Sequence, residues 1–264
     1  MKKINNYIFE RFENPKFSIL KRLHINKDTN NHQNNHYNYH PNDYELINLI
    51  NKLIKERGND CDLNDIDTSK ITDMSFIFRH SKFNGDISKW DVSNVKDMKF
   101  MFTDSKFNGD ISEWDVSNVK DMHGMFSKSY FNGDISNWDV SNVKYMKNMF
   151  AHSEFTGKNC DISNWNVRNV KTMDSMFMKS NFNGDISNWD VSNVEDMIYM
   201  FTGSEFNGDI SKWDVSNVKN MGFMFGNSKF NGDISNWNVS KVQFMNYMFY
   251  GSPLEKNPPK WYKE

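Results

Sequence analysis

The sequence predicts an α/β solenoid of about eight 24-residue coils, each a short strand plus a short helix, with an N-terminal capping helix. Three observations predict this fold class. Tryptophans recur at a fixed interval, each repeat unit combines two hydrophobic periodicities, and an amphipathic segment precedes the repeats. The 264 residues include 8 Trp, 22 Phe and 17 Met, which is enough apolar volume for a packed core.

The tryptophan interval sets the repeat length. The spacing is 24 residues throughout, except for 27 between Trp138 and Trp165, where Lys158, Asn159 and Cys160 are inserted. The series comprises Trp90, Trp114, Trp138, Trp165, Trp189, Trp213, Trp237 and Trp261. Complete units begin at Phe83, Phe107, Phe131, Phe155, Phe182, Phe206 and Phe230. We expect a degenerate first unit near Asn59 and a truncated last one from Leu254, so the repeat region covers residues 59–264.

Two periodicities occur within each unit. In the unit that begins at Phe83, apolar residues from Val95 to Phe102 are spaced 3, 3 and 1, which predicts a short helix that Asn94 can cap. Upstream, the segment Ile87–Val92 alternates and follows an Asn-Gly turn signal, which predicts a short strand. A single unit buries too little apolar surface to fold alone, so we expect the units to stack around one continuous core, with their strands in a parallel sheet.

The repeats resemble a known family. The string Phe-Asn-Gly-Asp-Ile-Ser-Asn-Trp-Asp-Val-Ser-Asn-Val, followed by Met-x-x-Met-Phe, is similar to the BspA-like surface-protein repeat, a relative of leucine-rich repeats. The resemblance covers roughly residues 59–264. It implies a solenoid like that of leucine-rich repeats, usually on secreted or surface-anchored proteins that serve in adhesion or protein recognition. The resemblance is also compatible with a protein of a large DNA virus or phage.

Two segments precede the repeats. Residues 41–58 predict a capping helix, because Asn42 to Arg57 has an apolar stripe, a start signal at Pro41 and a stop at Gly58. A partner-binding helix is the alternative. Residues 1–40 predict a basic arm and an Asn/His-rich linker. Three histidines in this linker are spaced by four residues, a pattern that on a helix would suggest a metal, but the abundant Asn favours a mobile linker: His32, His36 and His40.

Charge and hydropathy exclude several classes of protein. The 32 basic and 34 acidic residues leave a net charge of −2, so we expect no nucleic-acid partner. No apolar run is long enough for a membrane span. The N-terminus does not resemble a secretory signal, which favours a cytoplasmic or virus-associated location, although the family is usually surface-exposed; the compartment itself stays unknown. Cys61 and Cys160 lie about four coils apart, and we expect both to be free thiols.

The repeats place aspartates in two columns. The first column includes Asp86 and Asp110, and stacking brings its like charges close together. Backbone N–H groups and Ser hydroxyls within the turn are the favoured partners, and a row of bound cations is the alternative. The second column begins at Asp91 and becomes Asn166 and Asn238 in two units, which indicates a capping or ladder role.

No residue pattern indicates catalysis, a metal centre or a cofactor. The three histidines of the repeat region occupy variable positions with no partner implied by their spacing: His80, His123 and His152. We therefore expect a protein that is not an enzyme. Aligned lysines such as Lys96 and Lys120 stand beside acidic residues, which is typical of a solvated face.

One column changes chemistry between units while its core neighbours do not. Its members are Phe76, Phe100, Gly124, Asn148, Ser175, Tyr199, Phe223 and Tyr247. This variation indicates an outward-facing column whose aromatics suit a partner, with packing against the next coil as the alternative. The predicted partner-binding residues are Phe100, Tyr199, Phe223, Phe244 and Tyr247.

These observations predict a non-enzymatic recognition or adhesion scaffold that presents a repetitive solenoid surface to a protein or glycan partner. The alternative is a structural spacer, or a component of a virion or cell-surface layer.

Overall fold

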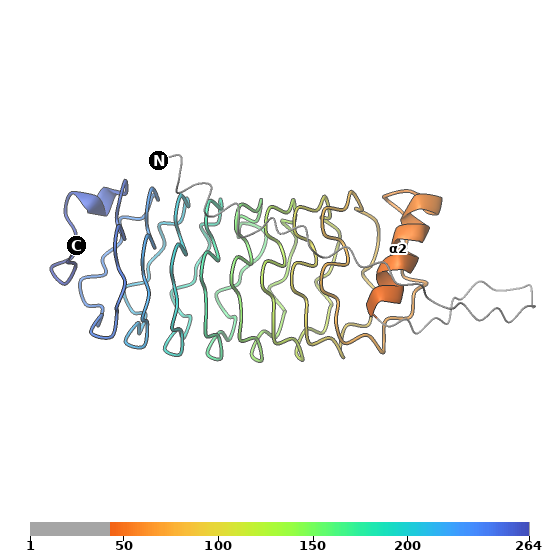
Figure 1. Cartoon of the computed structure of the whole chain (residues 1–264), viewed down its shortest axis with the longest axis horizontal. Coiled ribbons are helices and arrows are strands. Elements are labelled where there is room, and N and C mark those ends of the chain that lie inside the picture. The colour runs from red at the N-terminus through yellow and green to blue at the C-terminus, as the bar shows by residue number, and fades with distance from the viewer. Residues whose placement is uncertain (1–42, 264) are drawn as a thin grey trace, which may run out of the picture. The chain divides into compact units, whose positions relative to one another are not determined.

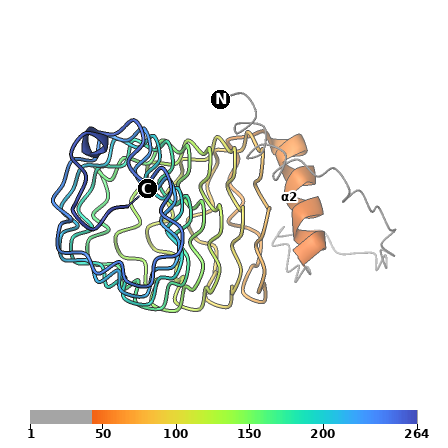
Figure 2. The same ribbon diagram turned by 60° about the vertical axis from the view of Figure 1, so that its left-hand side comes forward.

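The computed structural model describes residues 43–263, and the arm and linker predicted at 1–40 lie outside this range. The described part contains one α-helix, α2 (Asp43–Arg57), and one short 3-10 helix, η1 (Pro253–Glu255). Between them the chain winds through a row of stacked coils, with α2 at the first coil and η1 at the last (Figure 1). Figure 2 shows the coils as closed loops around a common interior.

The amphipathic helix predicted at Asn42 to Arg57 is confirmed by α2. Leu46, Ile50 and Leu53 are buried in the same hydrophobic cluster as Leu63 and Ile66 of the first coil. The helix therefore shields the apolar interior at this end of the stack, the role expected of a cap in a repeat protein. The domain boundaries proposed with it stay a prediction.

The end of α2 is fixed by two kinds of contact. Gly58 has a φ of +96°, and its N–H donates to the carbonyl of Ile54 at 2.9 Å, which terminates the helix. The guanidinium of Arg57 donates to both carboxylate oxygens of Asp65, at 3.0 and 2.8 Å. This paired contact ties the helix to the first coil.

The predicted strand-plus-helix coil, and with it the α/β fold class, is wrong. Among residues 43–263, α2 is the only α-helix, and no segment forms a named β-strand. The segment expected to be helical, Val95–Phe102, contains turns, as does the segment Ile87–Val92 that was expected to be a strand. Parallel pairing is confined to isolated bridges such as Asp97 to Asp121, repeated from coil to coil.

The reason lies in the backbone angles. Phe100 and Asp104 have φ values of +55° and +53°, whereas an α-helix needs φ near −63° throughout. The left-handed conformation recurs in two columns of the stack, four residues apart. The first contains Phe76, Phe100, Gly124, Asn148, Ser175, Tyr199, Phe223 and Tyr247. The second contains His80, Asp104, Lys128, His152, Lys179, Gly203, Asn227 and Gly251.

Backbone hydrogen bonds hold the coils together without strands. The N–H groups of Met98 and Phe100 donate to the carbonyls of Asp121 and His123 in the next coil, at 2.9 and 2.8 Å. The intervening Met101 N–H instead donates to the carbonyl of Met98 in its own coil, at 3.3 Å. Alternate donors thus serve the neighbouring coil and the local turn, so the buried backbone of this segment is satisfied.

The coils share one apolar interior. Trp114 and Trp138 are both buried and belong to the same cluster, as stacking of 24-residue blocks requires. The indole N–H of Trp114 donates to the carbonyl of Ile87 in the preceding coil, at 3.2 Å. Cys61 and Cys160 are free thiols, as predicted.

Candidate functional site

The coils differ from one another mainly on one face. The columns that pass through Asp97, Lys99 and Phe100 change residue type from unit to unit. The flanking Met98 column is Met throughout, and the Met101 column changes only to Ile77 in the first unit. We call these three columns the variable face. The inter-coil bridges run along the first of the columns, so each member lies next to its counterpart in the adjoining coil.

Aromatic rings gather on the variable face near the C-terminal end of the stack. The ring centroids of Tyr199 and Phe223 are 5.4 Å apart, and those of Phe223 and Tyr247 are 5.0 Å apart. Tyr250 packs edge-on against Tyr247 at 6.3 Å. Tyr247 is 52% exposed and Phe244, three residues before it, is 60% exposed, whereas Tyr199 and Phe223 are half-buried. We call these five residues the C-terminal ridge.

Phe100, the fifth predicted partner-binding residue, lies apart from the ridge. Its ring stacks on Phe76 at 5.2 Å and contacts His123 at 4.6 Å. The guanidinium of Arg79 lies over the rings of Phe76 and Phe100, at 5.6 and 5.8 Å from their centroids. A Cβ at Gly124 would come within 2.5 Å of the Phe100 ring, so glycine is needed there for this packing. The structure thus brings three of the five predicted residues into contact, Tyr199, Phe223 and Tyr247, and Phe244 stands three residues before Tyr247 in the same coil.

A polar cluster that the sequence did not predict separates the two aromatic groups. Lys147 Nζ pairs with Asp174 Oδ2 at 2.5 Å, and the Ser175 hydroxyl donates to Asp174 Oδ1 at 2.6 Å. Asn148 is only 4% exposed, and both its Nδ2 and Nε2 of His123 are buried without a hydrogen-bond partner. Burial, reinforced by the charge of Lys147, lowers the pKa of His123 to about 4, so its imidazole is neutral near pH 7.

The first aspartate column makes hydrogen bonds inside its own turns. Asp86 Oδ1 accepts the backbone N–H of Ser88 at 2.9 Å, and this bond is the main cause of its lowered pKa. The same bond recurs from Ser112 to Asp110, at 3.0 Å. The predicted capture by backbone N–H groups is therefore confirmed at these positions. No group of three His, Cys, Asp or Glu residues within 43–263 lies close enough to hold a metal ion.

The second aspartate column, which begins at Asp91, also accepts hydrogen bonds from its own turns. Asp91 Oδ1 accepts from both the N–H and the hydroxyl of Ser93, at 3.0 and 2.6 Å. In the unit that carries Asn166, the amide oxygen accepts the N–H of Arg168 at 3.3 Å. The capping role predicted from the exchange of Asp for Asn is confirmed by these turns.

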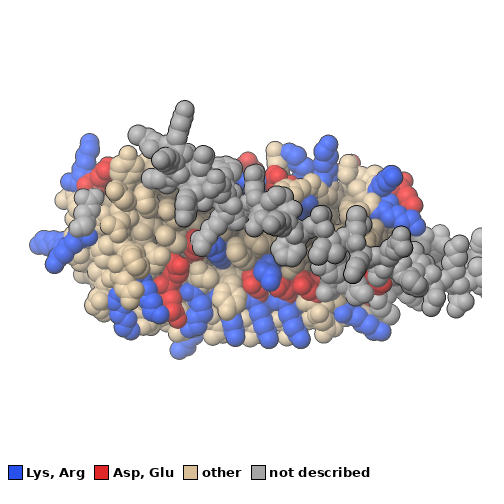
Figure 3. All heavy atoms as spheres, in the orientation of Figure 1, with Lys and Arg blue, Asp and Glu red and all other residues tan. Residues whose placement is uncertain are grey.

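Charged side chains of both signs lie along the stack. Figure 3 shows rows of basic side chains with acidic ones beside them. Lys219 Nζ pairs with Glu195 of the preceding coil at 2.6 Å, and both side chains are exposed. Such exposed pairs contribute little free energy to folding, as expected of a solvated face.

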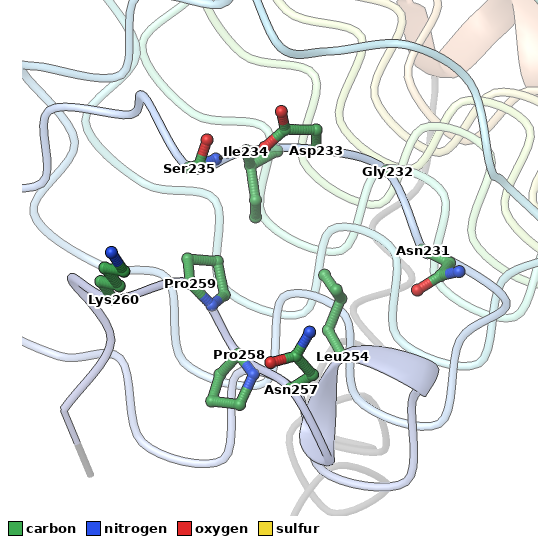
Figure 4. A pocket seen from close by; sticks show the side chains of 10 residues that line it. All are labelled: Asn231, Gly232, Asp233, Ile234, Ser235, Leu254, Asn257, Pro258, Pro259 and Lys260. Atoms are coloured by element: carbon green, nitrogen blue, oxygen red, sulfur yellow. Dashed lines mark hydrogen bonds between the residues drawn. The ribbon is translucent and has the colours of Figure 1, made fainter.

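One pocket of about 500 Å³ lies at the C-terminal end of the stack (Figure 4). Ile234 of the last complete coil and Leu254 of the C-terminal segment both extend into it, and Pro258 and Pro259 form part of its wall. Asp233 and Lys260 are the titratable residues of its lining. No helix in the described part of the chain has both the length and the apolar character needed to cross a membrane.

Comparisons with known proteins identify the family to which the repeats belong. The family described as "Mycoplasma protein of unknown function, DUF285" matches residues 48–161 and again residues 152–261. No curated protein matches the chain, and no solved structure matches it. The family match is consistent with the BspA-like resemblance of the repeat motif. Because the two matches together cover most of the sequence, the chain belongs to the DUF285 family of repeat proteins.

Proposed function

We propose that the chain is a non-enzymatic recognition scaffold of the BspA-like repeat type, which binds a protein partner through the C-terminal ridge. The observation that supports this proposal is that aromatic side chains are exposed at positions whose residue type varies between coils. Phe244 and Tyr247 are 60% and 52% exposed, at positions where other coils carry Asp, Gly or Asn. Exposed aromatics that cluster on one face are typical of binding sites, since each ring buries much area at little conformational cost.

The ring orientations favour a protein over a glycan. Tyr199, Phe223 and Tyr247 stack with interplanar angles of 24° and 30°, so neighbouring rings cover one another's faces. A sugar ring packs best against an open aromatic face. These three rings therefore offer mainly edges and the hydroxyls of the two tyrosines, which suit the mixed apolar and polar surface of a protein.

The test replaces the ridge rings with a residue that the repeat itself contains at this position. Asn148 occupies the same left-handed position as Tyr199, Phe223 and Tyr247, so changing all three to Asn removes the rings and keeps the backbone angles. A control variant, Lys120→Ser, changes the solvated face. Both chains and the wild type are immobilised and used to capture proteins from the cells in which the chain is found.

The proposal expects one or more proteins that bind the wild type and the Lys120→Ser variant but not the triple Asn variant. Equal capture by all three chains would contradict it. Binding of the wild type to a glycan array that disappears in the triple Asn variant would replace the protein partner with a glycan.

A further inference from the structure

The last complete coil, residues 230–253, is covered on only part of its outer side. Trp261 takes the next place in the tryptophan series, and its indole N–H donates to the carbonyl of Ile234 at 2.9 Å. The repeat pattern then breaks, because Tyr262 stands where the other units have Asp or Asn, and its ring packs edge-on against Phe249 at 5.0 Å. Residues 254–261 thus follow the path of a ninth coil only as far as its tryptophan.

Core residues of this coil are uncovered beyond that point. Val239, Val242 and Met245 are partly exposed, whereas their counterparts in the other complete coils are buried. Beside them stand three exposed aromatics, Phe244, Tyr247 and Tyr250, at 60%, 52% and 46%. This end of the stack therefore presents an apolar surface that a further coil would bury.

Three backbone N–H groups at this end have no acceptor within residues 43–263. In the coil before it, the N–H groups of Met221, Phe223 and Phe225 donate to carbonyls of the last coil at 2.7, 3.1 and 2.9 Å. The three equivalent N–H groups of the last coil have no hydrogen bond among the described residues: those of Met245, Tyr247 and Phe249. The fourth donor, Gly251 N–H, is satisfied by the Glu255 carboxylate at 3.0 Å.

We infer that this end of the stack is a docking site for a polypeptide segment that completes the ladder. Of these donors, Met245 and Tyr247 belong to residues that are at least partly exposed, whereas Phe249 is buried beneath Trp261 and Tyr262. The two accessible donors are two residues apart, and an extended chain presents its carbonyls on one side at that same interval. A glycan has no such regular row of acceptors. A second copy facing this one tail to tail would bring donors against donors, and a head-to-tail copy would present its α2 instead of an open coil.

The sequence of the segment that would bind best can be inferred from the side chains and carbonyls that an inner coil presents to the coil before it. Residues 214–227 contribute five side chains to the shared core: Val215, Val218, Met221, Met224 and Phe225. Within the same segment, backbone carbonyls such as those of Gly222 and Met224 accept hydrogen bonds from N–H groups of the preceding coil. A segment with apolar residues at these intervals fits the exposed Val239, Val242 and Met245. This inference goes beyond the proposed function and does not rest on it, since the uncovered core and the free donors remain if Tyr199 and Phe223 bind nothing.

The experiment measures binding of a fluorescein-labelled synthetic peptide with the sequence of residues 211–229 to the full chain, by fluorescence anisotropy. Saturable binding to the wild type is expected, with none for a peptide of scrambled sequence. The variant Val242→Lys places a charge on the exposed core and is expected to bind roughly tenfold more weakly or worse. A double variant, Tyr199→Asn with Phe223→Asn, is expected to bind the peptide like the wild type, because these two ridge residues belong to earlier coils and are not part of the uncovered end.

A capped variant provides the decisive control. Replacing residues 262–264 with the sequence of residues 214–229 continues the ninth coil over the open end. We expect this variant to bind no peptide and to melt at a higher temperature than the wild type. Absence of saturable peptide binding to the wild type, or equal binding to the capped variant, would overturn the inference. So would a wild-type dimer that the capped variant lacks, since the occupant would then be a second copy.

Discussion

The left-handed residues limit which side chains each coil tolerates. The column that contains Phe100 holds aromatic, amide, hydroxyl and glycine residues, but it holds no Val, Ile or Thr. A β-branched side chain clashes with the backbone at positive φ, whereas Asn tolerates that conformation. Residues of this left-handed column therefore vary in polarity and size, but β-branched residues are excluded.

This constraint predicts a difference between two substitutions at one position. Phe100→Val and Phe100→Asn both remove the stacking with Phe76, but the left-handed conformation disfavours Val relative to Asn by about 1–2 kcal/mol. We expect the Val variant to unfold at a lower urea concentration than the Asn variant, with equal slopes. The opposite order of the two midpoints would show that backbone strain does not govern this column.

Two half-buried histidines couple stability to pH. Burial, together with Lys147, lowers the pKa of His123 to about 4. Burial, together with Lys179 and Lys128, lowers the pKa of His152 to about 4 as well. Both rings are neutral in the folded chain at a pH where the unfolded chain, with a His pKa near 6.5, already binds protons.

The direction of the pH dependence follows from the number of protons that each state binds. Between about pH 6.5 and pH 4 the unfolded state binds more protons than the folded state, so the free energy of unfolding falls as the pH falls through this window. We expect the double variant His123→Asn and His152→Asn to lose most of this dependence, since Asn246 and Asn227 occupy the same columns. Urea titrations at pH 7 and pH 4.5 measure the difference. Burial raises the pKa of Asp121 and Asp196, and these groups act in the opposite direction in both proteins.

At the scale of elements, α2 stabilises the stack through one side only. Ile50 is buried in the common core, whereas Asn48 is exposed. We expect Ile50→Ala to destabilise the chain by about 2–5 kcal/mol, because it leaves a cavity between helix and first coil. Asn48→Ala, on the other side of α2, is the matched control and is expected to change stability little. Equal urea midpoints for the two variants would mean that the helix does not cap the core.

The sequence predicts α2 correctly and the coils incorrectly for a common reason. Apolar spacing reports which residues face the interior, and it identifies both the stripe of α2 and the core positions Val95, Met98, Met101 and Phe102. Spacing does not report backbone angles. In α2 the only geometry that fits the pattern is a helix, whereas a spacing of 3, 3 and 1 also fits consecutive turns with a left-handed residue at Phe100.

The candidate site could be predicted in part. Variation between units identifies the variable face, because it compares positions that share one backbone environment. It does not show that Phe100 packs with Arg79, away from Tyr199, or that the polar cluster around Asp174 lies between them. The signal for that separation was the change to small residues at Gly124, whose meaning depends on packing between coils.

At the scale of the whole molecule, the fold is a sum of neighbouring contacts. Each coil bonds only to the coil before it and the coil after it, as the isolated bridges from Asp73 to Phe244 show. The three residues inserted around Cys160 leave this register intact, since the Trp165 indole N–H still donates to the carbonyl of Ile135 at 3.2 Å. Stability of such an array depends on the number of interfaces and on the two ends.

This organisation predicts the outcome of deleting a repeat. Removing residues 107–130 joins Lys106 to Phe131 and keeps every column in place, so the chain is expected to fold into a shorter stack with native-like buried tryptophan emission. Its urea midpoint should fall modestly, because one interface is lost. Removing residues 107–118 instead takes out half a unit, which sets the Trp138 and Met125 columns against unlike neighbours and leaves backbone donors unpaired. We expect this second chain to expose its tryptophans and to lose cooperative unfolding. If both deletions lower the midpoint alike, the 24-residue block is not the unit of stability, and the stack depends on contacts that span several coils.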